Sequence, residues 1–191
     1  MARQRWLGLI LLMAAGIGCV PSLYPLYTEE TVVFDPKLGG CWQTEKNEMW
    51  CFTRHENTNS YDLVIVENDQ KRSYLLAHLV QIGDNRFLDL YPKRQPLEAG
   101  GWWEYHLLPV HTFYLVEASE PNLVLSAMMP DAMEKLLSEK PGLLKHEMVE
   151  DRLVLTASTL QLQAFLEQPE MVERVFGEPA ALKPYQPPSE R

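Results

Sequence analysis

The chain has 191 residues and a formal net charge of −9 at neutral pH. A chain of this length suits one domain, which can bury about 70% of its unfolded surface and therefore needs no metal to fold. The net negative charge argues against nucleic acid as a partner and against binding to anionic lipid through clusters of basic residues.

The first 18 residues are predicted to be a signal peptide. Arg3 and Arg5 form a basic head, and an apolar run from Trp6 to Ile17 leads into Gly18. This order of charge, apolar core and small residues is typical of an export signal. The apolar core is too short to cross a bilayer as a helix, which needs about 20 residues.

Cys19 follows the small residues directly, and this ending resembles the lipobox of bacterial lipoproteins. The resemblance implies that Cys19 is acylated, carries palmitate-type chains and becomes the new N-terminus. It also implies an exported protein, held in the cell membrane or outer membrane by lipid and facing the periplasm or the exterior. Two or three acyl chains suffice for such an anchor. Ordinary secretory cleavage is the alternative, because Gly16-Ile17-Gly18 also fits the small-x-small rule.

Residues 19–30 are expected to form the lipid anchor and a tether, because Pro21 and Pro25 interrupt any helical or strand period. A single β-rich domain is predicted over residues 31–177. The proline-rich residues 178–191 are predicted to be a disordered tail.

The first hairpin predicts a disulfide. Residues 40–44 and 48–53 read as strands, and a three-residue loop at 45–47 places Cys41 opposite Cys51 and Trp42 opposite Trp50. In a non-hydrogen-bonded pair the Cα atoms are about 4.5 Å apart, which a disulfide accepts. Export implies an oxidising compartment and favours the bridge; two buried free thiols are the alternative.

More strands are expected along the chain. A three-residue loop at 83–85 would place Ile82 opposite Arg86 and His78 opposite Leu90. A long loop from Pro92 to Gly101 then leads into the adjacent Trp102 and Trp103. The other expected strands cover residues 61–67, 105–117 (interrupted by Pro109) and 123–127.

Two short C-terminal helices are predicted from capping boxes at Asp131–Glu134 and Ser158–Gln161, with a hairpin between them. Residues 171–176 extend the second helix beyond a break at Pro169. The fold class is therefore mainly β (α+β): an antiparallel meander curled into a barrel or half-barrel, with two short C-terminal helices.

Gly40-Cys41-Trp42 resembles the G-x-W start of the lipocalin and calycin families, which implies that Trp42 closes the floor of a barrel. The Thr-Asp-Tyr motif of those families is missing here. A broader resemblance, carried by this start, by AHLVQIGDNRFLDLYP and by LTASTLQLQAF, is to uncharacterised bacterial lipoproteins. It implies no known activity.

No motif in the sequence has the spacing of a metal site, a nucleophile elbow or a phosphate-binding loop, so no cofactor and no metal are expected. His55 and His146 are expected to be solvated. The candidate ligand-binding residues are Trp42, Trp50, His78, Asp89, Trp102, Trp103, His106 and His111.

The sequence favours a lipid-anchored, non-enzymatic module that binds an apolar small molecule or an envelope protein. A structural lipoprotein with a filled barrel and an unrecognised hydrolase are the alternatives. A hollow interior above about 300 Å³ favours an apolar ligand, whereas a packed interior favours the structural role. A cleft that brings Asp89 within about 3 Å of a histidine favours the hydrolase.

Overall fold

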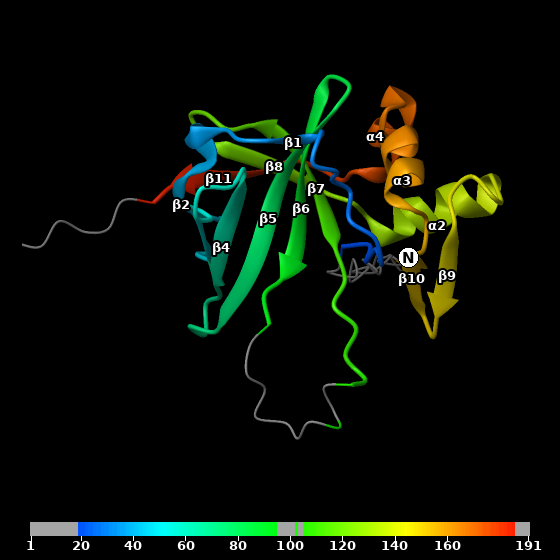
Figure 1. The fold of residues 1–191 in the computed structure, drawn as a ribbon, viewed down its shortest axis with the longest axis horizontal. Helices are drawn as coiled ribbons and strands as arrows, with labels where there is room; N and C mark the ends of the chain where they lie inside the picture. Colours follow the sequence, from blue (N-terminus) through cyan, green and yellow to red (C-terminus); the bar gives the residue numbers. More distant parts are fainter. Residues whose placement is uncertain (1–18, 95–101, 103–104, 186–191) are drawn as a thin grey trace, which may run out of the picture.

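The computed structural model describes residues 19–94, 102 and 105–185 (Figure 1). The predicted signal peptide, Trp103 and the last six residues therefore lie outside the described residues.

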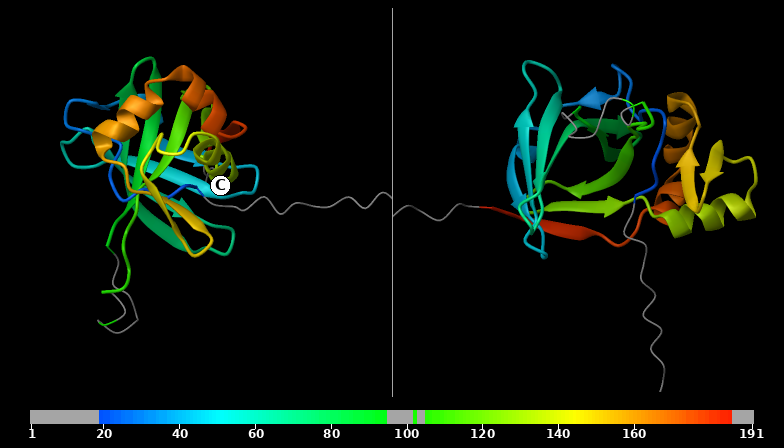
Figure 2. Two further views of the ribbon diagram at one scale, coloured as in Figure 1. Left: turned by 90° about the vertical axis from the view of Figure 1, so that its right-hand side faces the viewer. Right: turned by 90° about the horizontal axis from the view of Figure 1, so that it is seen from below.

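The centre of the structure is a closed antiparallel β-barrel, which confirms the predicted fold class (Figures 1 and 2). The chain meanders from β2 to β8, and pairing of β11 with both β8 and β2 completes the ring. A ninth strand, β1 (Val32–Val33), pairs with β5 beside the barrel. The barrel strands are β2 (Gly40–Gln43), β3 (Met49–Arg54), β4 (Ser60–Val66), β5 (Arg72–Ile82), β6 (Asn85–Pro92), β7 (Thr112–Ala118), β8 (Leu123–Ala127) and β11 (Ala180–Pro184).

Strand β11 corrects the prediction of a disordered tail from residue 178. Leu182 is buried opposite Leu123 of β8, and Lys183 pairs with Gln43 of β2. The segment has a single buried side chain, so its sequence shows no alternation that would reveal a strand. Pro184 is tolerated because it lies at the end of the strand.

The first hairpin forms as predicted. The Thr44 amide donates to the Glu48 carbonyl at 2.9 Å, and Asn47 adopts a φ of 64°. Cys41 and Cys51 are directly opposite and form the predicted disulfide, with their Cα atoms 4.0 Å apart.

The hairpin between β5 and β6 differs by one residue from the prediction. Its loop has two residues rather than three, and Gly83 takes the first position with a φ of 55°. A glycine in that position is typical of a two-residue hairpin turn that matches the twist of the strands. As a result His78 faces Asp89 rather than Leu90.

Strand β7 begins at Thr112, not at residue 105 as predicted. Proline has no amide hydrogen for the ladder, which is why the strand starts only after Pro109.

Two hydrophobic cores share the barrel wall. One fills the barrel and includes Trp42, Trp50, Phe52, Tyr61 and Leu88. The other lies outside the wall and joins it to a helical unit beside the barrel (Figure 2). That unit contains α2 (Pro130–Glu139), β9 (His146–Val149), β10 (Arg152–Leu155), α3 (Thr159–Leu166) and α4 (Pro169–Val175).

The C-terminal region has three short helices instead of the predicted two. The Gln161 side chain accepts a hydrogen bond from the Ser158 amide at 3.0 Å, which confirms that capping box. Pro169 starts a separate helix, because a proline is favoured at the first helical position and disrupts a helix interior. The box at Asp131 is wrong, since α2 already begins at Pro130.

The predicted tether is also wrong for residues 19–27, which we call the N-terminal segment. Val20 and Leu26 are fully buried in the outer core. Ser22 exchanges two backbone hydrogen bonds with His111, at 2.9 and 2.8 Å, and Leu23 donates to Leu155. Apolar burial and these hydrogen bonds outweigh the extended preference of the two prolines.

Replacing both Cys41 and Cys51 by serine should lower the free energy of unfolding by about 2 to 3 kcal/mol, because the bridge closes only a short loop. Urea unfolding of the variant and of the oxidised wild type measures the difference. The wild type treated with reductant is the matched control and should lose the same amount. Equal stability of all three proteins would show that the bridge does not form.

Candidate functional site

Asp89 is the centre of a buried polar cluster on the outer face of the barrel wall. Its side chain is fully buried, with Oδ1 2.7 Å from Nδ1 of His111. Its other oxygen, Oδ2, accepts the Leu26 amide hydrogen at 2.6 Å. Because a buried carboxylate is costly unless it is hydrogen-bonded, both contacts are needed for Asp89 to lie here.

His78 lies opposite Asp89 and completes the cluster with two tyrosines. Its ring stacks on Tyr27 with the centroids 3.8 Å apart, and the ring of Tyr91 lies 4.5 Å from that of His111. His78 Nδ1 is buried and has no hydrogen-bond partner among the described residues. Burial lowers the pKa of His78, although the negative charge of Asp89 acts in the opposite direction.

The cluster attaches the N-terminal segment to the barrel. Asp89 and His78 come from neighbouring strands, His111 directly precedes β7, and Leu26 and Tyr27 belong to the N-terminal segment. A histidine oriented by a carboxylate also occurs in hydrolase triads. Here, however, the second carboxylate oxygen holds the Leu26 amide, and the buried Ser22 hydroxyl donates to the Tyr24 carbonyl at 2.8 Å.

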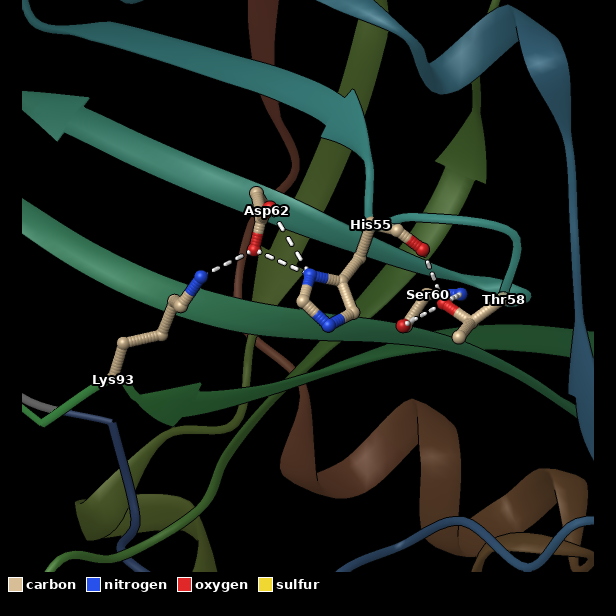
Figure 3. A network of polar contacts seen from close by, with 5 residues as sticks. All are labelled: His55, Thr58, Ser60, Asp62 and Lys93. Atoms are coloured by element: carbon tan, nitrogen blue, oxygen red, sulfur yellow. Dashed lines mark hydrogen bonds and ion pairs between the residues drawn. The ribbon is translucent and has the colours of Figure 1, made fainter.

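A second polar network lies nearby on the barrel wall (Figure 3). Asp62 on β4 contacts Lys93 Nζ at 2.7 Å and His55 Nδ1 at 3.0 Å. Desolvation acts to raise the pKa of Asp62, but the hydrogen bonds from Lys93 and His55 lower it below its ordinary value. Thr58 donates to the His55 carbonyl at 2.6 Å and lies 2.7 Å from Ser60.

This network is not predicted from the sequence, where His55 is expected to be solvated and Asp62 is not among the candidate residues. The turn between β3 and β4 could have indicated it. Thr53 pairs with Asp62 across the two strands, so His55, two residues after Thr53, lies beside the Asp62 carboxylate. The network is half-exposed, so its ion pairs contribute little to stability.

Trp42 and Trp50 are opposite each other, as predicted, and both point into the barrel. The Trp42 indole N–H donates to the Leu38 carbonyl at 3.0 Å, at the end of the short 3₁₀ helix η1 (Pro36–Leu38). The Trp50 ring packs edge-on against Tyr114. The two tryptophans therefore face away from Asp89 and His78, which lie on the outer side of the wall.

Of the remaining candidates, Trp103 lies outside the described residues, and Trp102 and His106 do not join either group. Trp102 is 84% exposed and packs near Tyr105, with the ring centroids 6.1 Å apart. His106 is exposed. The seven candidate residues in the described part of the chain thus fall into three groups: a barrel pair (Trp42 and Trp50), a wall cluster (His78, Asp89 and His111) and two exposed residues (Trp102 and His106).

The described surface has several hollows of a size that can hold a ligand, among them one of about 410 Å³ lined by Leu115, Ser126 and Phe176 and two larger ones. One, of about 700 Å³, lies at an end of the barrel and includes Trp42, Glu120, Pro121 and Tyr185 in its lining. The second, a groove of about 670 Å³, lies between the N-terminal segment and the β9–β10 hairpin. Neither contains the Asp89 cluster.

Cys19 is half-buried at the start of the N-terminal segment. Its thiol donates to the Tyr114 hydroxyl at 3.1 Å. Burial raises the pKa of Cys19, so the thiolate needed for nucleophilic chemistry is disfavoured. Desolvation likewise raises the pKa of Tyr114.

Within residues 19–94, 102 and 105–185, no group of three acidic, histidine or cysteine side chains could hold a metal ion. In the same part of the chain, no helix is both long and apolar enough to cross a membrane. No family model, no curated protein and no solved structure matches the chain.

Replacing Asp89 by asparagine should lower the free energy of unfolding by about 2 to 4 kcal/mol, because it removes the charge that both hydrogen bonds of the carboxylate use. The Leu26 amide should also exchange with solvent faster. Urea unfolding and amide hydrogen exchange measure the two effects. Asp84→Asn, at an exposed turn, is the control and should change stability by less than about 0.5 kcal/mol. An unchanged Asp89→Asn protein would contradict the structural role of the cluster.

The lowered pKa of His78 predicts loss of stability in mild acid. The unfolded chain takes up a proton near pH 6.5, whereas folded His78 takes it up only at lower pH, so stability falls as the pH drops through that range. His78→Phe keeps the stack on Tyr27 and removes this contribution. Unfolding between pH 7.5 and 5.5 should therefore depend less on pH in His78→Phe than in the wild type or in a control, His106→Phe. Identical slopes in all three would show that His78 is not the group responsible.

Proposed function

We propose that this protein is a lipid-anchored, non-enzymatic protein of the cell envelope. Its barrel serves as a filled scaffold, and its outer surface binds a protein partner. The N-terminal sequence from Arg3 to Cys19 supports export and acylation.

The observation that carries the scaffold role is the packing inside the barrel. Trp42, Trp50, Phe52 and Tyr61 project into it, and each is at most 9% exposed. A carrier for an apolar molecule uses an enclosed pocket of about 300 to 1,000 Å³. Large aromatic side chains occupy that space here, so the outer surface is where a partner can bind.

A hydrolase is the second candidate, because Asp89 and His111 meet at the distance expected of a catalytic pair. The geometry favours it less. Asp89 also holds the N-terminal segment through Leu26, and the neighbouring Ser22 is fully buried with its hydroxyl already bonded.

The anchor is tested by replacing Cys19 with serine in the full chain. The wild type should fractionate with membranes and carry the mass of two or three acyl chains, whereas Cys19→Ser should move to the soluble fraction of the envelope. Cys41→Ser, which keeps Cys19, is the control and should remain with membranes.

The filled barrel is tested on the same purified wild type by native mass spectrometry. We expect the mass of the polypeptide and its anchor alone. A co-purifying apolar molecule that is lost on unfolding would contradict the scaffold role, and a wild type without lipid would contradict the anchor.

A further inference from the structure

The N-terminal segment leaves almost no distance between Cys19 and the folded domain. Val20 is fully buried, its amide donates to the Met128 carbonyl at 3.3 Å, and Leu155 donates to Pro21 at 2.8 Å. Four residues of extended chain span at most about 14 Å. Leu23 must therefore lie within that distance of Cys19, and a bilayer that holds acyl chains on Cys19 must approach the same part of the surface.

Most of the exposed apolar side chains of the described chain lie in three short segments. Of the ten large hydrophobic side chains that are exposed in the described part of the chain, eight lie in the segments 23–24, 102–108 and 148–149. These segments are far apart in the sequence. A soluble domain seldom exposes such side chains together unless they contact a membrane or a partner.

The groove beside the β9–β10 hairpin brings the three regions together. Leu23, Leu108 and Val149 line it and are 36%, 71% and 57% exposed, and Pro21 and Val110 also line it. The β9–β10 hairpin of the helical unit and the chain that leads into β7 point toward the same side of the molecule, with the N-terminal segment between them (Figures 1 and 2). We call this surface the basal face.

We propose that the basal face rests on the lipid bilayer in which Cys19 is anchored, with Leu108 and Val149 in contact with lipid. This inference rests on the proposed anchor. The short, ordered connection after Cys19 supports this proposal, because it holds the domain close to the bilayer and places the basal face at the lipid surface. Trp102 and Tyr105 fit the same role, since these residue types favour the interface between water and lipid.

The charges of the groove indicate which lipid it contacts. Glu147, Glu150 and Asp151 line one wall beside a single cation, Arg152. Anionic headgroups would repel this wall, whereas zwitterionic headgroups offer a positive group to each carboxylate. The basal face therefore suits a zwitterionic surface.

An environment-sensitive fluorophore, NBD, can report contact with lipid. It is attached to Leu108→Cys and, separately, to Val149→Cys in the full lipidated chain, where Cys19 is blocked by lipid and the other two cysteines form the disulfide. The control is Asp84→Cys, because the turn between β5 and β6 projects from the opposite end of the barrel (Figure 1). All three positions are exposed, so each variant should fold, which circular dichroism checks.

On reconstitution into phosphatidylcholine vesicles, the emission at positions 108 and 149 should shift to shorter wavelength and gain intensity, with no change at position 84. Vesicles rich in phosphatidylglycerol should reduce the shift. No shift at 108 or 149 in a protein that carries lipid would overturn the basal contact and leave the anchor intact. A wild type without lipid mass on Cys19 would instead overturn the anchor and, with it, this inference.

Discussion

The buried carboxylate of Asp89 is the contact on which the arrangement of the molecule depends. One oxygen holds His111 at the start of β7, and the other holds the backbone at Leu26. A charge in this position is stable only while both partners are present, because an unpaired buried carboxylate is costly. Asp89 thus links the barrel wall to the first residues that follow Cys19. These residues are therefore held against the barrel and do not extend into solvent.

The barrel wall separates two kinds of surface with different roles. Alternation along β5 and β6 sends Leu79 and Leu88 inward and His78 and Asp89 outward. The inward side packs mainly apolar and aromatic groups, and the Trp42 indole N–H donates to the Leu38 carbonyl. The outward side combines apolar contacts with the N-terminal segment and a small number of polar contacts that fix its position. In the proposed function, the barrel gives rigidity and the outer layer gives position relative to the membrane.

Much of the fold could be predicted from the sequence, because local signals decided it. The loop at 45–47 set the register of Cys41 and Cys51, and the Ser158–Gln161 pair set the start of a helix. Signals that depend on distant partners were missed. Residues 180–184 form a strand only because β2 and β8 both offer a free edge, and the N-terminal segment is ordered only because the outer core buries Val20.

The candidate site was predicted in part. His78, Asp89 and His111 were singled out by residue type and do meet, but through a register that differs by one residue, because a two-residue turn at Gly83 replaces the expected three-residue turn. A slip of one residue reverses the face of every side chain in a strand. The separation of these residues from Trp42 and Trp50 follows from the direction of side chains in a closed barrel, which the sequence pattern alone does not fix.

The position of β11 has a consequence for biosynthesis. The strand that completes the ring is the last element of the described chain, and it pairs with β2, the first strand of the barrel to be synthesised. The ring cannot close until residues 180–184 have emerged from the ribosome. Until then the edges of β2 and β8 remain unpaired, a state in which strands readily pair with other chains. Release of a nearly complete chain, truncated by a few residues before β11, would leave an open sheet rather than a slightly shorter barrel.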